Sequence, residues 1–285
     1  MNRAPLSASR LAVCCGWLLA CHAPAVWSQE AAAQTSPAAT PPLPEAQGQA
    51  RWVLGATLVS QSTYGGGANQ KLGLRPVVAG RVGRWMVSSS SARLISGMDL
   101  GRGISTTLVA ADRWSVGAGL RLTQGRRNTA DPMLSGMPSI KASVALRAVA
   151  GYAVTPQWQL SGSVQQDLLR HQGVRASLGL GWSRPLGQAW VLSAGAGLGW
   201  ADARAMQTFY GVEPGQARPG RAAWQPGAGV ESWGWSVGMS RSLSPHWRMA
   251  GSIGRGTLLG DAARSPLTQQ RSSNSASITL AYVGW

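Results

Sequence analysis

The sequence lacks cysteine beyond its N-terminal segment, and it also lacks long apolar runs. Cys14, Cys15 and Cys21 are its three cysteines. We therefore expect the remainder to have no disulfide, no thiolate metal site and no cysteine nucleophile. No later stretch is apolar for the roughly 18 consecutive residues of a membrane-spanning helix, so the sequence predicts no transmembrane helix.

Negative charge is scarce as well. The chain of 285 residues has 26 Lys and Arg against 10 Asp and Glu, which gives a net charge of +16. Charged residues make up 13% of the chain, whereas an ordinary globular domain has about 25%. It has one Phe but 14 Trp and 37 Gly, which is unusual for a soluble enzyme. The basic residues are dispersed along the chain, so nucleic-acid binding is not indicated.

Residue patterns for catalysis or cofactor binding are also missing. The sequence has no metal-ligand spacing, phosphate loop or nucleotide fingerprint, so we expect no metal and no cofactor. His171 and His246 are interpreted as ordinary residues of connections at opposite ends of the fold. Asp261 and Ser265 in "GDAARSP" are interpreted as turn residues, with Asp261 capping backbone amides, rather than as an acid and a nucleophile. We expect no catalytic residue and a non-enzymatic protein.

The first 28 residues resemble an export signal. Two arginines precede the short apolar run "LAVCCGWLLA", and small residues follow it. This pattern predicts a cleaved signal peptide at 1–28, cut after Ala25 or Ser28. The alternative is lipoprotein processing at Cys21.

Residues 29–50 are rich in Pro, Ala and Gln and have almost no bulky apolar side chain. Such a segment cannot bury enough surface to offset its ordering entropy, which predicts a flexible or extended periplasmic linker. Residues 51–285 remain as the folded domain.

From residue 51 onward, apolar residues alternate with small or polar ones. In "RWSVGAGLRLTQ" (113–124), Trp114 and Leu120 belong to the apolar set, whereas Ser115 and Arg121 belong to the opposite one. The same period of two recurs in "IKASVALRAVAGY" (140–152), "VRASLGLGW" and "WVLSAGAGLGW". Successive side chains of a strand point to opposite faces, so these are strands with one apolar and one polar face.

Strand length and connections indicate a membrane barrel. The runs cover about 9–13 residues, longer than the roughly 5–6 of common soluble strands and near the roughly 9–11 of tilted membrane strands. Backbone polar groups cannot stay unpaired in lipid, so such strands must close into a barrel. Tight connections near Gly83, 111–112, 155–157, 185–187 and 244–246 alternate with mostly longer ones at 61–72, 96–103, 125–138, 169–173, 202–230 and 260–272. This predicts an all-β, antiparallel up-and-down transmembrane β-barrel in the outer membrane, with about twelve strands, ten being the alternative count, and with short turns facing the periplasm.

The aromatic residues follow the same arrangement. Nine of them fall beside the short turns and predict a periplasmic girdle at the membrane interface: Trp52, Trp85, Trp114, Trp158, Trp190 and Trp247 begin strands, and Tyr152, Trp182 and Trp285 end them. Trp200, Trp233 and Trp235 are expected at the other rim. A soluble sandwich with aromatics between two sheets is the alternative, but it predicts no relation between tryptophans and short turns.

The last strand ends in Trp285, as an outer-membrane insertion signal would. Counting back by twos from Trp285 gives Val283 and Ala281, but the bulkier Tyr282 and Leu280 lie in the opposite phase. Either Gly284 marks a β-bulge or the register shifts, and we favour the bulge.

Three stretches, "STYGGG" (62–67), "FYGVEPGQA" (209–217) and "LLGDAARSPL" (258–267), resemble motifs of the MipA/OmpV family over roughly 50–285. Members usually end in Tyr-x-aromatic, whereas this chain is one residue longer. The resemblance implies an outer-membrane barrel and, for the best-known member, a scaffold that joins the lytic transglycosylase MltA to a peptidoglycan synthase. The motif residues singled out in its loops are Tyr64, Gly65, Tyr210, Gly211, Gly260, Asp261, Ser265 and Pro266.

The polar face of the strands is cationic. Six residues are predicted to point into the lumen: Arg113, Arg121, Lys141, Arg147, Arg175 and Arg248. Such an interior attracts anions. Alternatively, Ser, Gln and the acids Asp167 and Glu231 satisfy these cations in a plugged barrel. Both interpretations remain open.

Arginines in the long connections are expected to pair with lipid phosphates outside the barrel: Arg126, Arg127, Arg218, Arg221, Arg264 and Arg271. The expected partners are therefore outer-membrane lipid and lipopolysaccharide.

Three functional hypotheses follow. The first is a scaffold that binds periplasmic murein enzymes, the second is a small channel favouring anionic solutes, and the third is surface adhesion through the 202–230 loop. The scaffold rests on the family resemblance, and the channel rests on the cationic lumen.

Overall fold

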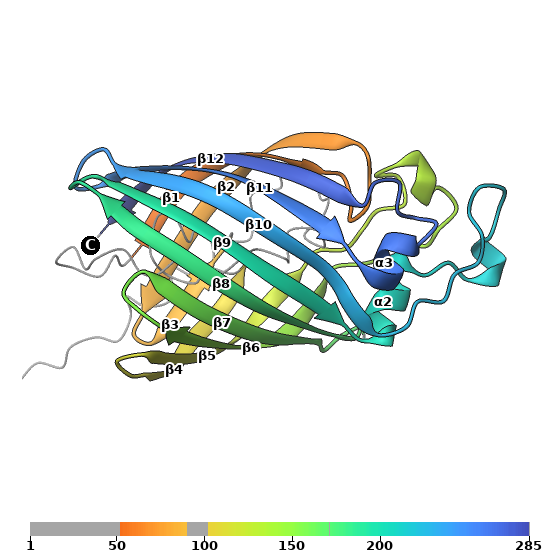
Figure 1. Cartoon of the computed structure of the whole chain (residues 1–285), viewed down its shortest axis with the longest axis horizontal. Helices are drawn as coiled ribbons and strands as arrows, with labels where there is room; N and C mark the ends of the chain where they lie inside the picture. Colours follow the sequence, from red (N-terminus) through yellow and green to blue (C-terminus); the bar gives the residue numbers. More distant parts are fainter. Residues whose placement is uncertain (1–51, 90–101, 171, 285) are drawn as a thin grey trace, which may run out of the picture.

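Twelve antiparallel strands form a closed barrel in the computed structural model, which describes residues 52–89, 102–170 and 172–284 (Figure 1). Each strand pairs with its neighbours in sequence, and β1 closes the sheet against β12. The strands are β1 (Trp52–Ser62), β2 (Gln70–Val82), β3 (Trp85–Ser88), β4 (Gly103–Ala110), β5 (Trp114–Thr123), β6 (Ser143–Ala153), β7 (Trp158–Asp167), β8 (Val174–Leu186), β9 (Trp190–Ala201), β10 (Gly229–Ser242), β11 (Trp247–Leu258) and β12 (Ser272–Gly284). The predicted fold class and strand count are confirmed.

The predicted signal peptide at 1–28 with Cys21, the linker at 29–50, His171 and Trp285 lie outside the described residues. No helix within the described ranges is long and apolar enough to cross a membrane.

The strands are apolar on the outside. Leu178 of β8 is 69% exposed and Ile253 of β11 is 59% exposed. The residues that precede them, Ser177 and Ser252, are partly buried and hydrogen-bonded to serines of neighbouring strands. A single closed sheet that presents leucine, isoleucine and valine outward is what lipid favours and water disfavours. The alternative of a soluble sandwich, with its aromatics between two sheets, is wrong.

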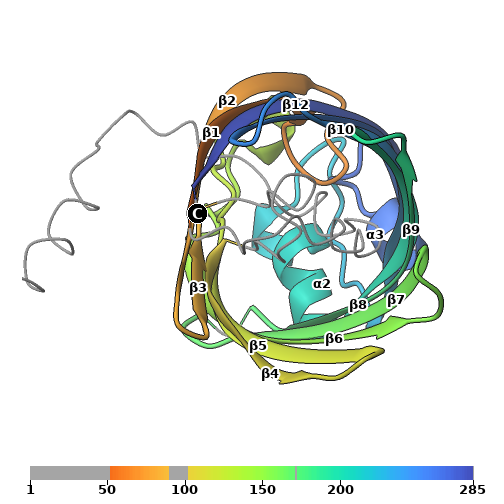
Figure 2. The same ribbon diagram turned by 90° about the vertical axis from the view of Figure 1, so that its left-hand side faces the viewer.

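Connections differ strongly between the two ends of the barrel. At one end the turns have two to four residues, at 83–84, 111–113, 154–157, 187–189 and 243–246. The long connections lie at the other end, together with the helices α2 (Ala203–Tyr210) and α3 (Gly260–Arg264) and the 3₁₀ turns Pro132–Leu134 and Pro214–Gln216. Figure 2, seen from the short-turn end, shows α2 lying across the lumen.

The helix α2 was not expected from the sequence. Asp202 caps it, because its carboxylate accepts from the backbone N–H of Ala205 at 2.7 Å. Gly173 has a φ of 89°, and a side chain there would collide with Asp202 and Ala205. A glycine at 173 therefore lets the β7–β8 connection approach the start of α2.

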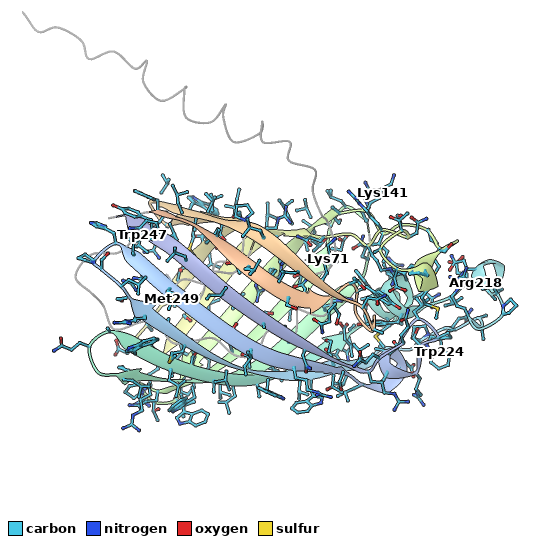
Figure 3. The ribbon with its side chains drawn as sticks, turned by 90° about the horizontal axis from the view of Figure 1, so that it is seen from above. Lys71, Lys141, Arg218, Trp224, Trp247 and Met249 are labelled. Atoms are coloured by element: carbon cyan, nitrogen blue, oxygen red, sulfur yellow. The ribbon has the colours of Figure 1, made fainter. Side chains whose placement is uncertain are left out.

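Most of the described tryptophans lie at the short-turn end, where Figure 3 labels Trp247. Trp52, Trp85, Trp114, Trp158 and Trp247 begin strands and are 40–55% exposed, and Trp190 begins β9 half-buried. Tyr152 packs on Trp114 with ring centroids 4.5 Å apart. Trp182 pairs with Trp158 but does not end its strand, which continues to Leu186. That these residues contact the membrane interface stays a prediction.

The closing strand corrects the favoured bulge at Gly284. The β1–β12 register is continuous from Ser60–Ala276 to Trp52–Gly284, so no residue is inserted there. Ile278 and Leu280 face outward, whereas Ala281 and Val283 are buried inside. The bulkier side chains thus take the lipid side, as burial energetics require.

Tyr282 is an aromatic residue at this seam that the predicted girdle omitted. Its ring stacks on Trp52 at 5.4 Å and on His246 at 5.1 Å, and it meets Trp247 edge-on at 5.4 Å. Gly284 makes room for this group, because a side chain there would collide with the indole of Trp52.

Candidate functional site

Four long connections pack into one structure at the long-loop end, which we call the loop cap: residues 63–69, 124–142, 202–228 and 259–271. Its core holds two apolar clusters. One joins Tyr64, Leu134, Met137, Val212 and Leu267, and the other joins residues of α2, α3, β9 and β11 around Met206 and Tyr210. Figure 3 shows Arg218 and Trp224 at this end, opposite Trp247.

Tyr64 joins the first connection to the last. Its hydroxyl donates to the carbonyl of Leu267 at 2.8 Å and accepts from the amide of Gln269 at 3.0 Å. Gln269 also donates to Asp131, which in turn accepts from Asn69 at 2.9 Å. Burial, with the nearby charge of Asp131, raises the pKa of Tyr64 to about 12.

The motif residues of the 202–228 and 259–271 connections meet directly. The hydroxyl of Ser265 donates to the carbonyl of Tyr210 at 2.6 Å and accepts from the N–H of Leu267 at 3.1 Å. Tyr210 is buried, and burial together with the charge of Glu231 raises its pKa. Gly65, Gly211 and Pro266 lie in the same connected region, next to Tyr64, Tyr210 and Ser265 in sequence.

Asp261 ties the start of α3 to the 202–228 connection. Its carboxylate accepts from the backbone N–H of Gly227 at 2.7 Å and from Arg264 at 2.6 Å, and these two hydrogen bonds lower its pKa. Gly260, just before it, has a φ of 51°. Asp261 and Ser265 thus each make hydrogen bonds within the loop cap.

Two arginines that were expected to meet lipid phosphates are buried in the loop cap instead. Arg126 donates to the carbonyl of Phe209 at 2.7 Å, and its burial lowers its pKa to about 10. Arg221 donates to the carbonyls of Gln216, Met133 and Ser135. This corrects the prediction for both: carbonyls that the loops would leave unpaired are better partners than distant phosphates.

The six predicted lumen cations separate into two groups. Arg121, Arg147, Arg175 and Arg248 lie on strands with partly buried side chains. Arg113 lies in the turn before β5, and Lys141 lies in the connection before β6; both are exposed (Figure 3 labels Lys141). The strands begin later than the alternation suggested, so these two residues lie just outside them. That Arg113 and Lys141 point into the lumen stays a prediction.

Three of these arginines line one cavity, which we call the arginine pocket. Arg121, Arg147 and Arg175 line this cavity together with Ser163, Gln165, Ser177 and Glu231. Strand pairing explains the grouping: Arg147 of β6 is opposite Gln165 of β7, which is opposite Arg175 of β8. Directly opposed side chains have Cβ atoms roughly 4.5–5.5 Å apart.

Glu231 enters the pocket through a β-bulge. The β9–β10 register shifts between Val230 and Ser232, so Glu231 has no partner residue on β9. Glu231 and Ser232 are therefore both buried, while Val230 and Trp233 on either side face outward. The Glu231 carboxylate approaches the Nε of Arg175 at 3.5 Å.

The arginine pocket contacts the loop cap at Phe209 of α2. The guanidinium of Arg175 lies over the ring of Phe209 of α2 at 4.0 Å, a cation–π contact. The Arg175 side chain is thus positioned by strand β8, by the carboxylate of Glu231 and by the ring of Phe209. Neither Phe209 nor the bulge was recognised from the sequence; Asp202 followed by apolar residues at 205, 206, 209 and 210 was the available signal for α2.

Among the described residues, no group of three or more His, Cys, Asp or Glu side chains could hold a metal ion. The His246 side chain contacts the closing strand: its Nδ1 lies 3.0 Å from the carbonyl oxygen of Val283, and its ring stacks on Tyr282.

Solved structures similar to this chain are outer-membrane barrels. The NanC porin is 12% identical, with a TM-score of 0.42 and coverage of 80% of this chain and 98% of that one. An outer membrane channel from Pseudomonas putida F1 is 10% identical, with a TM-score of 0.42 and coverage of 87% and 98%. At these values the likeness is distant, and no functional argument rests on it. No curated protein matches the sequence.

The sequence family described as "MltA-interacting protein MipA" matches residues 54–284. That match includes all of the barrel strands except the first two residues of β1, and all four connections of the loop cap, in agreement with the motif resemblance. The chain therefore belongs to the MipA family, as an outer-membrane β-barrel.

Proposed function

We propose that this protein is a non-enzymatic scaffold that links peptidoglycan hydrolase and synthase enzymes to the outer membrane. The observation that carries the proposal is the family match over 54–284, because the family is named for interaction with MltA. The loop cap supports it indirectly, because at the long-loop end the connections pack into two apolar clusters.

The proposed docking face is the short-turn end, which carries both ends of the described barrel. Its turns are short but basic. Arg84 and Arg113 lie in turns, and Arg184 and Arg241 lie near strand ends; all four are exposed, and Asp112 is the one acidic residue beside them in these turns and strand ends. Arg84 and Arg241 lie over the rings of Trp85 and Trp190. A partner with an acidic surface complements this face.

A binding experiment tests the scaffold. The purified barrel in lipid nanodiscs is immobilised and exposed to an MltA-type hydrolase, with and without residues 29–50 and with an Arg84→Gln/Arg113→Gln double variant. We expect binding that the double variant weakens, and an Arg127→Gln variant at the opposite end is the matched control. Absence of binding in every form of the barrel would reject the scaffold.

An anion-favouring channel is the second candidate, and the arginine pocket is the observation that favours it. Planar-bilayer recording tests it with Arg121→Glu and Arg147→Glu, which should reverse any anion preference. Arg184→Glu, exposed outside the pocket, is the control. A barrel that conducts no current, or that prefers cations, is not this channel.

A further inference from the structure

We propose that the outer wall of β10, β11 and β12 binds the phosphorylated sugar headgroup of lipopolysaccharide, and that Arg255 of β11 holds its phosphate. The three strands lie side by side in the wall (Figure 1). The inference is independent of both candidate functions, because binding a lipid needs neither a murein enzyme nor a current through the barrel.

Arg255 projects from the barrel wall towards lipid. Its cross-strand neighbour on β10 is Trp235, which is 37% exposed, and its neighbour on β12 is Asn274, which is also exposed. Ile253 lies two residues before Arg255 and therefore on the same face, and it is one of the exposed apolar residues of the wall. Arg255 is thus a charged residue of the lipid-facing surface and does not line the lumen.

No carboxylate of the described strands can balance this charge. Asp167 and Glu231 are the acidic residues of those strands, and both are buried. Within the described ranges, no ion pair or side-chain hydrogen bond engages Arg255. A charged side chain that faces lipid is costly unless it reaches the membrane interface or meets an opposite charge, and the phosphate of a lipid headgroup supplies that charge.

The height of Arg255 in the wall matches the headgroup region. From Trp247 to Arg255, β11 rises roughly 20 Å along the barrel axis, at about 3.4 Å per residue and a strand tilt of about 40°. The apolar band of such barrels is about 25 Å tall, and aromatic residues flank it on both sides. Because Trp247 lies at the short-turn edge, Arg255 and Trp235 lie near the opposite edge, on the side of the long connections that are predicted to face the cell exterior.

The residues around Arg255 are ordered as a glycolipid is, apolar towards the middle of the wall and polar above. The row nearer the middle is Val237, Ile253 and Ala276. The two rows above it form what we call the outer-wall patch: Trp235, Arg255 and Asn274, followed by Trp233, Thr257 and Ser272. Acyl chains suit the first row, and a headgroup suits the patch.

Chemical complementarity favours a phosphorylated sugar over a simpler headgroup. The guanidinium fork of Arg255 matches the oxygens of a phosphate. Beside it, Asn274 offers an amide, and Thr257 and Ser272, whose hydroxyls bond each other at 3.0 Å, offer groups that suit sugar hydroxyls. Trp233 and Trp235 add indole rings, which have an apolar face and a polar N–H and therefore suit the membrane interface. A glycerol phosphate would use the guanidinium but few of the other groups.

Native mass spectrometry of the full-length barrel, purified in detergent, tests the site with three lipids. The probes are diphosphoryl lipid A, phosphatidylglycerol, which has a phosphate but no sugar, and a neutral diglucosyl diacylglycerol, which has sugars but no phosphate. We expect lipid A to bind about three- to tenfold more tightly than either, because it alone combines both groups. Equally tight binding of phosphatidylglycerol or of the neutral glycolipid would overturn the assignment.

Variants locate the binding on the wall and cancel the differing numbers of acyl chains. Arg255→Gln should weaken lipid A about three- to tenfold and leave the neutral glycolipid unchanged. Arg184→Gln, which removes an exposed charge of β8 near the short-turn end, is the matched control and should leave lipid A binding unchanged. Asn274→Leu keeps the charge and should weaken lipid A more than phosphatidylglycerol.

Heat-dependent electrophoretic mobility verifies that each variant still forms a barrel. A folded Arg255→Gln variant that binds lipid A as tightly as the unaltered protein, or that loses no more affinity than Arg184→Gln does, would contradict the proposal.

Discussion

The two ends of this barrel connect its twelve strands in opposite ways. At the short-turn end two to four residues reverse the chain, and the aromatic side chains remain exposed around the rim. At the long-loop end four connections build a second core, where Tyr64, Tyr210 and Leu267 are almost fully buried. The short-turn end is therefore only the rim of the barrel wall, whereas the long-loop end is a folded structure with its own packing and hydrogen bonds.

The largest expected effect is on the core of the loop cap. Tyr210→Ala removes a buried ring at the point where α2, Ser265 and Glu231 meet, and truncating a buried aromatic residue costs about 3–5 kcal/mol. We expect the loops to become sensitive to protease while the strands remain protected. Limited proteolysis with mass spectrometry measures this, and uniform protection of the loops would show that the cap has no cooperative core.

A smaller effect is expected from a single hydrogen-bonding group of the loop cap. Ser265→Ala leaves the carbonyl of Tyr210 and the N–H of Leu267 without their hydroxyl partner, which costs about 1–3 kcal/mol for buried groups. Hydrogen exchange at Leu267 should accelerate accordingly. Ser244→Ala, in a turn of the opposite end, is the control; equal effects at both ends would remove the distinction between them.

The rim can be tested with a matched pair of glycines. Gly284→Ala places a methyl group against the indole of Trp52, while Gly73→Ala meets no atom within 4 Å. We expect the first to lower the free energy of unfolding by about 1 kcal/mol, the low end of overpacking effects, because the indole can turn away. Urea unfolding of the lipid-refolded barrel compares the two, and equal stability would contradict close packing at the seam.

The smallest effect concerns pH. The pKa of Tyr64 is raised to about 12, so its phenol stays neutral in the folded cap where an ordinary tyrosine, with a pKa near 10.0, ionises. Its contribution to stability is complete below pH 10 and is lost as the pH rises through about 12. The ultraviolet absorbance of phenolate, compared between the unaltered protein and Tyr64→Phe, should show one tyrosine titrating late. A difference spectrum centred near pH 10 would indicate that Tyr64 is solvated.

The barrel wall could be predicted from the sequence because its signal is local. The alternation of Trp114, Leu120 and Leu122 with Ser115 and Arg121 fixes which side chains face lipid, and short turns punctuate it at regular places. The position of Arg147 and Arg175 on the inner face followed from the same period of two. That these two arginines lie close together could not be predicted, because it depends on which residues the strand register places opposite each other.

The loop cap could not be predicted because its contacts join distant parts of the chain. Nothing near Arg126 or Arg221 in sequence indicates that each will be buried against carbonyls of another connection. Glu231 was named as an acid that could satisfy the lumen cations, but the β-bulge that places it beside Arg175 could not be predicted, because a bulge breaks the period of two. The motif resemblance identified Tyr64, Tyr210 and Ser265, but it did not predict that the three lie together in the loop cap.

The hydrogen bond from Tyr64 to Leu267 joins residues that are 203 positions apart. They become neighbours in space only when the first strand reaches the last, since one follows β1 and the other precedes β12. Contacts of such long range are slow to form and cannot help to start folding. The cap should therefore assemble last, after the cylinder has sealed, which makes protease resistance of its loops a sign that insertion is complete.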